Sequence, residues 1–361
     1  AATMVTAGVY LLVRTEFLFH ETPQVLHIVG WIGGITALLA AIMACVQTDI
    51  KKVLAYSTVS QLGYMMTAVG AGFAGAGFFH LLTHGVFKAL LFLGAGAVIH
   101  AVHSNEMKDM GQLFRRMPQV GIVFIIGTIA LAGVPFTAGY FSKEEVLGAT
   151  LAGGLTGPFV MLLIGAFLTA FYMSKTVFLV FFGQPAAHGH HDHGHGHGHG
   201  GDPGLTMAGP LWVLAIAATV IGGYFTLHHL EPEFTTPGWL TPTAVGMGLA
   251  GIGAAYLTYQ TRTISADTLA TVFAPIRIAA VNKFWLDDLF VGIYRHVLLT
   301  FARAIGWLDR YIVDGVLNVI SAWTLDGGDA LRRIQTGKVQ DYVLALGIGL
   351  LALVLWMRGT L

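Results

Sequence analysis

The sequence has 361 residues, of which 55% are hydrophobic and only 11% are charged. Soluble domains carry about 25% charged residues, so this composition excludes an ordinary cytosolic enzyme, a disordered regulator and a nucleic-acid-binding protein. Lysine plus arginine and aspartate plus glutamate both number 19, so no net charge attracts an anionic partner.

Long stretches without Asp, Glu, Lys or Arg predict membrane helices, because a membrane helix needs about 20 apolar residues. These stretches are 22–48, 53–87, 117–142, 146–174, 203–230, 234–261 and 342–357. With their flanks they predict helices near 1–14, 23–46, 51–70, 76–101, 118–150, 155–182, 207–228, 240–260 and 339–358. Buried helices of a soluble core would need polar outer faces, which these segments lack. The sequence therefore predicts an all-α fold, a polytopic bundle of transmembrane helices.

The segment 118–150 is predicted to be a broken helix. Gly133, Pro135 and Gly139 fall within seven residues, and proline removes a backbone donor and clashes with the preceding turn. Broken membrane helices usually line a cavity, whereas a simple kink is the alternative. Lys143 lies just beyond the break and favours the functional interpretation.

Three ionisable residues on the predicted helix 76–101 form the strongest chemical pattern in the sequence. His80, His84 and Lys88 are spaced by four, which places them on one helix face. Lys88 falls near the bilayer midplane, where a charged lysine facing lipid costs about 3 kcal/mol or more, so we expect it to face the bundle interior. Lysine deprived of water and histidine can both exchange protons near neutral pH. The spacing predicts a proton relay from Lys88 through His84 and His80 to Lys143.

Other polar residues in the membrane segments leave two interpretations open. The helix 51–70 carries Tyr56, Ser57, Thr58, Ser60, Gln61 and Tyr64, which can hold water beside the relay or hydrogen-bond to neighbouring helices. Lys175 of the helix 155–182 is expected to snorkel to the membrane interface on the side reached after the helix 23–46. Cys45 is the only cysteine, and the sequence has no nucleotide-binding loop and no spaced haem ligands, so we expect no cofactor in this chain.

Basic residues gather on the side of the membrane reached after the helix 23–46, which we call the basic side. Fourteen of the 19 Lys and Arg fall there, from Lys51 to Lys338. The positive-inside rule predicts that the basic side is cytoplasmic.

A histidine tract at 188–199 holds seven of the 16 histidines. Such tracts can bind metal, but glycine-spaced histidines provide no fixed ligand geometry. We interpret 183–206 as a His/Gly-rich loop on the basic side and predict no metal site.

The region 261–337 is predicted to contain a long amphipathic helix at 284–336. Its charges, Asp288, Arg295, Arg303, Arg310 and Asp314, recur near heptad spacing among Leu, Ile, Val and Trp. One helix of this length spans roughly 80 Å and carries too many charges to cross the bilayer, so it is expected to lie on the basic-side surface. Two or three short helices, or a bend at Gly327 and Gly328, are the alternatives. The final membrane helix falls within 338–361.

Several segments resemble the antiporter-like membrane subunits of respiratory complex I. The segments are QTDIKKVLAYSTVSQLGYM at 47–65, FHLLTHGVFKALLFLGAGAVIH at 79–100 and AGYFSKEEVL at 138–147, which also resemble the large subunits of multi-component sodium/proton antiporters. FWLDDLF at 284–290 and RRIQTGKVQDYVLAL at 332–346 resemble the subunit L family of bacterial NADH–quinone oxidoreductase in particular.

The resemblance implies a proton-translocating subunit whose activity is coupled to quinone reduction in other subunits. By residue match, Lys88 would be the central lysine, His80 and His84 its relay partners, and Lys143 the exit-side lysine on the broken helix. The long helix would be a lateral helix along the membrane arm. The implied partners are lipid and other membrane-arm subunits of the complex, without direct NADH binding, in a bacterial plasma membrane.

The resemblance also divides the chain. Residues 1–182 would belong to the antiporter-like bundle and 207–260 would add two membrane helices. The family carries a Lys/Glu pair on helices that precede residue 1, so we expect this chain to be a C-terminal part. A sodium/proton antiporter subunit, a metal-ion transporter using 188–199 and a purely structural clamp are the alternative functions.

Overall fold

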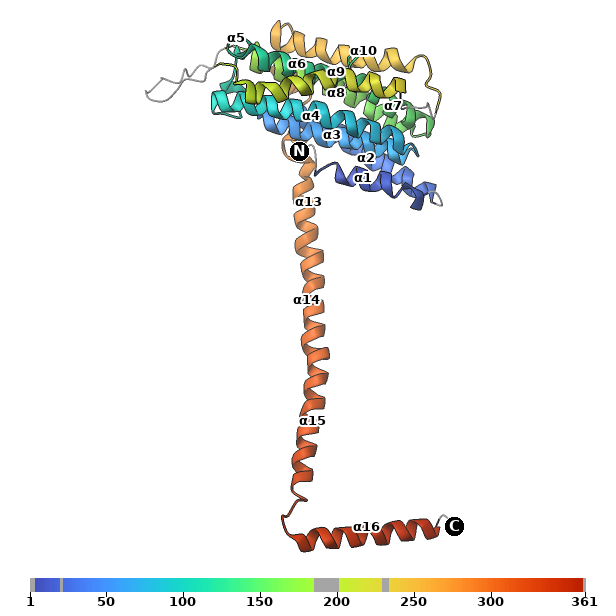
Figure 1. The fold of residues 1–361 in the computed structure, drawn as a ribbon. Helices are drawn as coiled ribbons and strands as arrows, with labels where there is room; N and C mark the ends of the chain where they lie inside the picture. Colours follow the sequence, from blue (N-terminus) through green and yellow to red (C-terminus); the bar gives the residue numbers. More distant parts are fainter. Residues whose placement is uncertain (1–3, 20–21, 185–200, 229–233, 360–361) are drawn as a thin grey trace, which may run out of the picture. The chain divides into compact units, whose positions relative to one another are not determined.

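The computed structural model describes residues 4–19, 22–184, 201–228 and 234–359, and the histidine tract at 188–199 lies outside these residues. The described residues are helical and contain no β-strand, apart from an isolated bridge between Asp49 and Glu106. The chain divides into two units, Ala1–Phe284 and Trp285–Leu361. Figure 1 shows the helices of both units.

The first unit is a helical bundle whose long helices agree with the predicted segments within a few residues. They are α1 (Ala7–Arg14), α2 (Pro23–Val46), α3 (Ile50–Gly70), α4 (Ala74–Val102), α6 (Pro118–Ala132), α7 (Ala138–Ala152), α8 (Thr156–Phe181), α9 (Leu205–His228) and α10 (Leu240–Ala255). A π-helical turn at Tyr256–Gln260 extends α10. The short helices α5 (Leu113–Arg116), α11 (Ala266–Val272) and α12 (Ala274–Val281) were not predicted.

Seven described helices are long and apolar enough to cross a membrane, by length and composition. Five of them, α2, α4, α8, α9 and α10 with its π turn, belong to the first unit. The other two are Val339–Gly359 and the run Lys283–Arg332, which contains an apolar window of sufficient length although the charges along the whole run predict a surface helix. The chain is therefore a multi-pass membrane protein, and the predicted all-α transmembrane bundle is confirmed.

Local sequence signals explain where several helices begin. Pro23 and Pro118 occupy the first turns of α2 and α6, where a missing backbone N–H costs no hydrogen bond. Asp49 precedes α3, and one of its carboxylate oxygens accepts hydrogen bonds from the backbone N–H groups of Lys51, at 2.7 Å, and Lys52, at 3.1 Å.

The predicted break in the segment 118–150 separates α6 from α7. Gly133 ends α6 in a left-handed conformation with φ +79°, which glycine adopts without a steric penalty. At the start of α7, a Cβ built on Gly139 would lie 1.9 Å from the carbonyl oxygen of Ala130. The two helices therefore approach one another at a position that only glycine fits, and the segment is more than a kinked helix.

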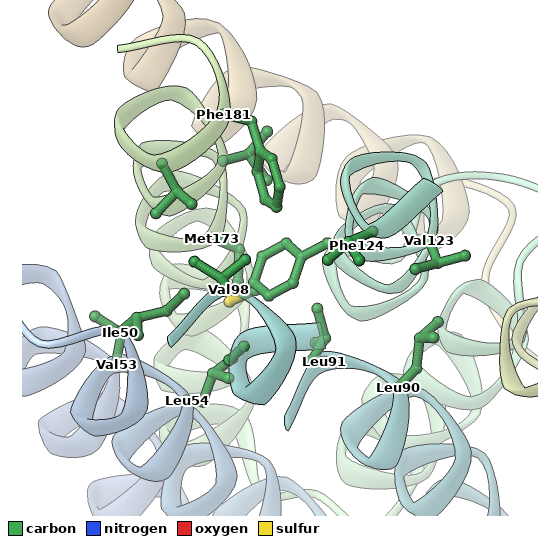
Figure 2. Close-up of a cluster of buried hydrophobic side chains, with 14 of the residues drawn as sticks. Ile50, Val53, Leu54, Leu90, Leu91, Val98, Val123, Phe124, Met173 and Phe181 are labelled. Atoms are coloured by element: carbon green, nitrogen blue, oxygen red, sulfur yellow. The ribbon is translucent and has the colours of Figure 1, made fainter. Parts of the chain in front are cut away.

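A hydrophobic core surrounds α4 and fixes the rotation of this helix about its own axis. α4 packs against α3, α6, α7 and α9. Figure 2 shows side chains of α4 among those of α3, α6 and α8; the labelled residues are Ile50, Val53, Leu54, Leu90, Leu91, Val98, Val123, Phe124, Met173 and Phe181. These large apolar side chains are buried, so rotating α4 about its axis would expose or displace several of them.

The second unit contains one long helical run. It consists of α13 (Leu286–Ile293), α14 (Leu299–Leu308) and α15 (Asp314–Arg332), joined by π-helical turns at Tyr294–Leu298 and Asp309–Val313. The run would extend roughly 70 Å at the rise of an α-helix. A single run, instead of two or three short helices, agrees with the sequence prediction.

The second unit ends with a separate apolar helix. Gly327 and Gly328 lie within α15 and do not end the long run. Beyond Arg332, α16 (Val339–Gly359) is the final helix that is long and apolar enough to cross a membrane. Its position agrees with the helix predicted near 339–358.

Candidate functional site

His80, His84 and Lys88 lie on one buried face of α4, as their spacing predicts. All three side chains are completely inaccessible to solvent in the structure. The ring centroids of His80 and His84 are 6.1 Å apart. The sequence therefore places three ionisable groups in a continuous line within the core of the bundle.

Lys88 is held by uncharged oxygens of α3. Its Nζ donates to the hydroxyl of Ser57 at 2.7 Å and to the backbone carbonyl of Leu54 at 3.2 Å. Tyr172 of α8 donates its phenol hydrogen to the same Ser57 oxygen at 2.7 Å. The lysine is thus fixed by hydrogen bonds that are compatible with gain and loss of a proton.

His80 connects α4 to α3 and α7. Its Nδ1 lies 2.9 Å from Ser142 Oγ of α7, and its Nε2 lies 3.1 Å from Gln61 Oε1 of α3. Thr83 also donates to Ser142 Oγ at 2.8 Å. Ser142 immediately precedes Lys143, so these hydrogen bonds bring the histidine line to the helix that carries the second predicted lysine.

His84 lies between these two groups, and neither of its ring nitrogens has a hydrogen-bond partner in the described structure. Its ring makes an edge contact with Phe87 at a centroid separation of 5.4 Å. Buried polar groups without partners cost free energy and call for an explanation. A histidine in this state can accept or release a proton without first breaking a fixed hydrogen bond.

Lys143 lies beside the break between α6 and α7. It is 4% exposed, and its Nζ donates to the carbonyl of Leu131 at 2.6 Å. That carbonyl lies in the last turn of α6, where backbone acceptors lack intrahelical partners. The ammonium nitrogen also lies 5.6 Å from the ring centroid of Tyr64.

A small cavity of about 20 Å³ adjoins Lys143, which is enough for one water. Glu144 and Tyr140 of α7 and Thr241 of α10 also line it, and Thr241 donates a hydrogen bond to the carboxylate of Glu144. The structure therefore places Lys143 beside a small cavity whose walls are mostly apolar, which agrees with the expectation that the broken helix lines a cavity.

The polar residues on α3 form hydrogen bonds to neighbouring helices and to α3 itself. Ser57 and Gln61 contact Lys88 and His80, whereas Ser60 donates to the carbonyl of Ala37 and Tyr64 to that of Leu162 on neighbouring helices. Thr58 bonds to its own helix at Leu54. The structure therefore shows direct hydrogen bonds between helices and within α3, and the interpretation that some of these residues hold water stays a prediction.

Three side chains of the site were not predicted: Thr83, Ser142 and Tyr172. Ser142 had a usable signal, because it adjoins Lys143 on the broken segment. Tyr172 had none, because a single tyrosine in an aromatic membrane helix does not reveal its partner.

Lys175 points toward the basic-side end of α2, in the predicted direction, but its ammonium group contacts backbone carbonyls instead of water. It is only 8% exposed, and its Nζ donates to the carbonyls of Cys45 at 2.9 Å and Gln47 at 3.0 Å, where α2 ends. A cation at a helix C-terminus satisfies carbonyls that lack intrahelical partners and interacts favourably with the helix dipole. Lys175 therefore joins α8 to the end of α2.

Known proteins resemble this chain over almost all of its length. Residues 1–171 match the family described as NADH:quinone oxidoreductase/Mrp antiporter, TM. Subunit L of NADH-quinone oxidoreductase from Escherichia coli is 38% identical over 99% of this chain, and the Mycobacterium tuberculosis subunit L is 36% identical over 97%. The chain belongs to this family of antiporter-like membrane subunits.

The chain is also similar to a third relative and to one solved structure. NAD(P)H-quinone oxidoreductase chain 5 from Picosynechococcus is 37% identical over 95% of the chain. This chain is shorter than these relatives. It spans 59% of the Escherichia coli protein, 57% of the Mycobacterium tuberculosis protein and 58% of the Picosynechococcus protein. The solved Mrp complex from Dietzia has a similar fold, with a TM-score of 0.54 and 21% identity over 69% of this chain and 52% of that one.

No group of three or more His, Cys, Asp or Glu side chains within the described ranges is arranged to hold a metal ion. The histidines at 188–199 lie outside those ranges and are not covered by this finding.

Proposed function

We propose that the chain is a proton-translocating part of a membrane subunit of NADH:quinone oxidoreductase, driven by quinone reduction in other subunits. The observation that carries the proposal is the buried line of Lys88, His84 and His80 on α4. The identities to subunit L and chain 5 proteins support this assignment over 95–99% of the chain.

The proposed relay begins at Lys88 and ends near Lys143. Lys88 releases a proton to the unpartnered ring of His84, one helical turn away. His84 passes it to His80, whose Nδ1 faces Ser142 on α7. Ser142 adjoins Lys143, which lies beside the cavity at the break. Buried ionisable residues in a membrane protein interior typically mark such proton pathways.

Proton flux in the assembled complex tests this proposal. NADH-driven acidification of inverted membrane vesicles should depend on the subunit and should collapse with a protonophore. Acidification that persists at the wild-type rate after removal of all four relay side chains, Lys88, His84, His80 and Lys143, would contradict it.

A sodium/proton antiporter subunit is the second candidate, because the family description includes the Mrp antiporters and the Mrp complex has a similar fold. In that case a sodium gradient alone would drive proton movement, without NADH. We expect NADH to drive proton uptake in sodium-free vesicles, and a strict requirement for sodium would favour the antiporter.

We place the chain in a bacterial plasma membrane with the basic side facing the cytoplasm. Fourteen of the 19 basic residues support this orientation. Labelling of single cysteines introduced at Lys108 or Arg262 by an impermeant maleimide should occur in inverted vesicles and not in intact cells.

Deletion of 188–199 should leave assembly and proton pumping at wild-type levels. The sequence of the tract is glycine-spaced and contains no hydrophobic anchor, so we do not expect the bundle to require it. Vesicle acidification and the subunit content of the purified complex measure this directly. Loss of either would assign the tract an essential role, and loss of zinc accumulation with intact pumping would support the metal-transport alternative.

The helical run Leu286–Arg332 should brace neighbouring membrane-arm subunits without moving as a piston. Its apolar side chains, among them Trp307 and Trp323, are exposed in the second unit and need lipid or protein cover. A cysteine crosslink between this run and a neighbouring subunit should therefore leave pumping unchanged. Abolished pumping in a fully assembled, crosslinked complex would favour the piston.

A further inference from the structure

Ser57 receives two hydrogen bonds at the point where Lys88 is held. Lys88 Nζ lies 2.7 Å from Ser57 Oγ, and Tyr172 donates to the same oxygen at 2.7 Å. All three side chains are completely buried, and they come from three helices, α4, α3 and α8. The relay proposed above uses Lys88 but assigns no role to Tyr172.

Ser57 can serve both protonation states of Lys88. A serine hydroxyl has one hydrogen to donate and two positions at which it accepts. When Lys88 is charged, Ser57 accepts one hydrogen bond from the ammonium group and one from Tyr172. When Lys88 has lost a proton, its nitrogen carries a lone pair, and Ser57 can turn its own hydrogen toward it. Tyr172 donates to Ser57 in both states.

The arrangement of Tyr172 supports this role. Its other polar contact is Thr169 Oγ1 at 3.4 Å, a longer and weaker hydrogen bond. Thr169 itself donates to the carbonyl of Gly165 at 2.7 Å. The phenol of Tyr172 is therefore directed mainly at Ser57. A buried tyrosine can instead donate to a backbone carbonyl, as Tyr64 of α3 does to the carbonyl of Leu162 on α8.

We propose that Tyr172 is a positioning residue for proton translocation, which donates to Ser57 and so keeps a reversible serine hydrogen bond on Lys88 in both of its protonation states. This inference rests on the proposed function, because it requires Lys88 to gain and lose a proton. Tyr172 itself transfers no proton in this scheme.

The effect of Tyr172 has to be separated from that of the other ionisable groups near Lys88. These groups are His84 on the same helix, His80 one turn further along it and Lys143 on α7. A variant that removes only the phenol oxygen changes none of them.

Tyr172→Phe in the assembled complex is the first test, because it keeps the aromatic ring and removes the hydroxyl. We expect NADH-driven proton pumping in inverted vesicles to fall about three- to ten-fold, the effect of losing one ordinary hydrogen bond. We also expect its pH profile to shift by about half a pH unit or more. A purely structural role would lower the rate or the yield without moving the profile.

A double-mutant cycle tests whether Tyr172 acts through Ser57. The Ser57→Ala/Tyr172→Phe variant should pump no more slowly than Ser57→Ala alone, because the phenol then has no serine to position. Thr176→Val is the matched control. It removes a buried hydroxyl of the same helix that bonds only to the carbonyl of Tyr172, and it should pump at the wild-type rate.

Three outcomes would overturn the inference. They are a wild-type rate and pH profile in Tyr172→Phe, losses that multiply in the double variant, and an equal loss in Thr176→Val. If Tyr172→Phe does not assemble, Ser57→Ala carries the test, and an unshifted pH profile in that variant overturns the inference. Lys88→Met separates the two proposals: wild-type pumping in Lys88→Met contradicts the proposed function itself, whereas loss there with normal Tyr172→Phe contradicts only the inference.

Discussion

Lys88→Met should reduce NADH-driven proton pumping about ten-fold or more while the complex still assembles. Methionine preserves much of the apolar volume of the lysine stem, so the packing of α4 is kept. The partners left behind remain satisfied, because Ser57 still accepts from Tyr172 and the Leu54 carbonyl from Thr58. Removal of a positioned proton carrier costs about 10²- to 10⁴-fold in proton-transfer rate. The ratio of vesicle acidification to NADH oxidation measures the effect.

Lys175→Met is the matched control for this variant. Lys175 is also a buried lysine that donates to backbone carbonyls, but its partners lie at the end of α2 and it has no hydrogen bond to the relay. Its replacement should lower stability without changing the ratio of protons pumped to NADH oxidised. If the ratio of protons pumped to NADH oxidised falls equally in both variants, then loss of any buried lysine impairs pumping, and the assignment of Lys88 to the relay would be wrong.

Gly139→Ala should prevent normal assembly of the subunit or abolish its pumping. The added methyl group would lie 1.9 Å from the carbonyl oxygen of Ala130, so the backbones of α6 and α7 would have to separate. Overpacking of this kind typically costs about 1–3 kcal/mol, and backbone contacts cannot relax by a rotamer change. Separation of the helices would also displace Lys143 from the Leu131 carbonyl. The subunit content of the purified complex and its proton pumping measure both effects.

Gly96→Ala provides the comparison for this variant. Gly96 lies within α4, and an added methyl group there meets no atom within 4 Å. Alanine is favoured over glycine in a helix interior by about 0.5–1 kcal/mol, so this variant should assemble normally. If Gly139→Ala assembles and pumps as well as Gly96→Ala, the close approach at the break has no functional importance.

The helices and the line on α4 could be predicted because they depend on short-range properties of the sequence. Uncharged stretches mark the membrane segments, and helical geometry alone places His80, His84 and Lys88 on one face. The break between α6 and α7 was predictable for the same reason, since Gly133, Pro135 and Gly139 act on the local backbone.

The partners of these residues could not be predicted, because they depend on how distant helices are rotated against one another. Ser57 and Tyr172 are 115 positions apart in the sequence, and His80 and Ser142 are 62 apart. Any of the polar residues on α3 was an equally good candidate until the rotation of α3 against α4 was known.

Lys175 illustrates a second limit. Hydropathy indicates that a lysine near a helix end must find a polar environment, but not whether that environment is water or a backbone carbonyl. The carbonyls of Cys45 and Gln47 become available only because α2 ends beside α8. That arrangement is a property of the tertiary structure, and neither the sequence of α2 nor that of α8 predicts it.

Proton pumping by Lys88→Arg tests the central claim most directly, because it separates charge from proton exchange. Arginine keeps the positive charge, but its guanidinium does not lose a proton in proteins. The measurement is the number of protons pumped per NADH oxidised by the assembled variant complex in sealed vesicles. The relay predicts the same loss as in Lys88→Met. A wild-type ratio in Lys88→Arg would show that a fixed charge at this position is sufficient, and would contradict proton transfer through Lys88.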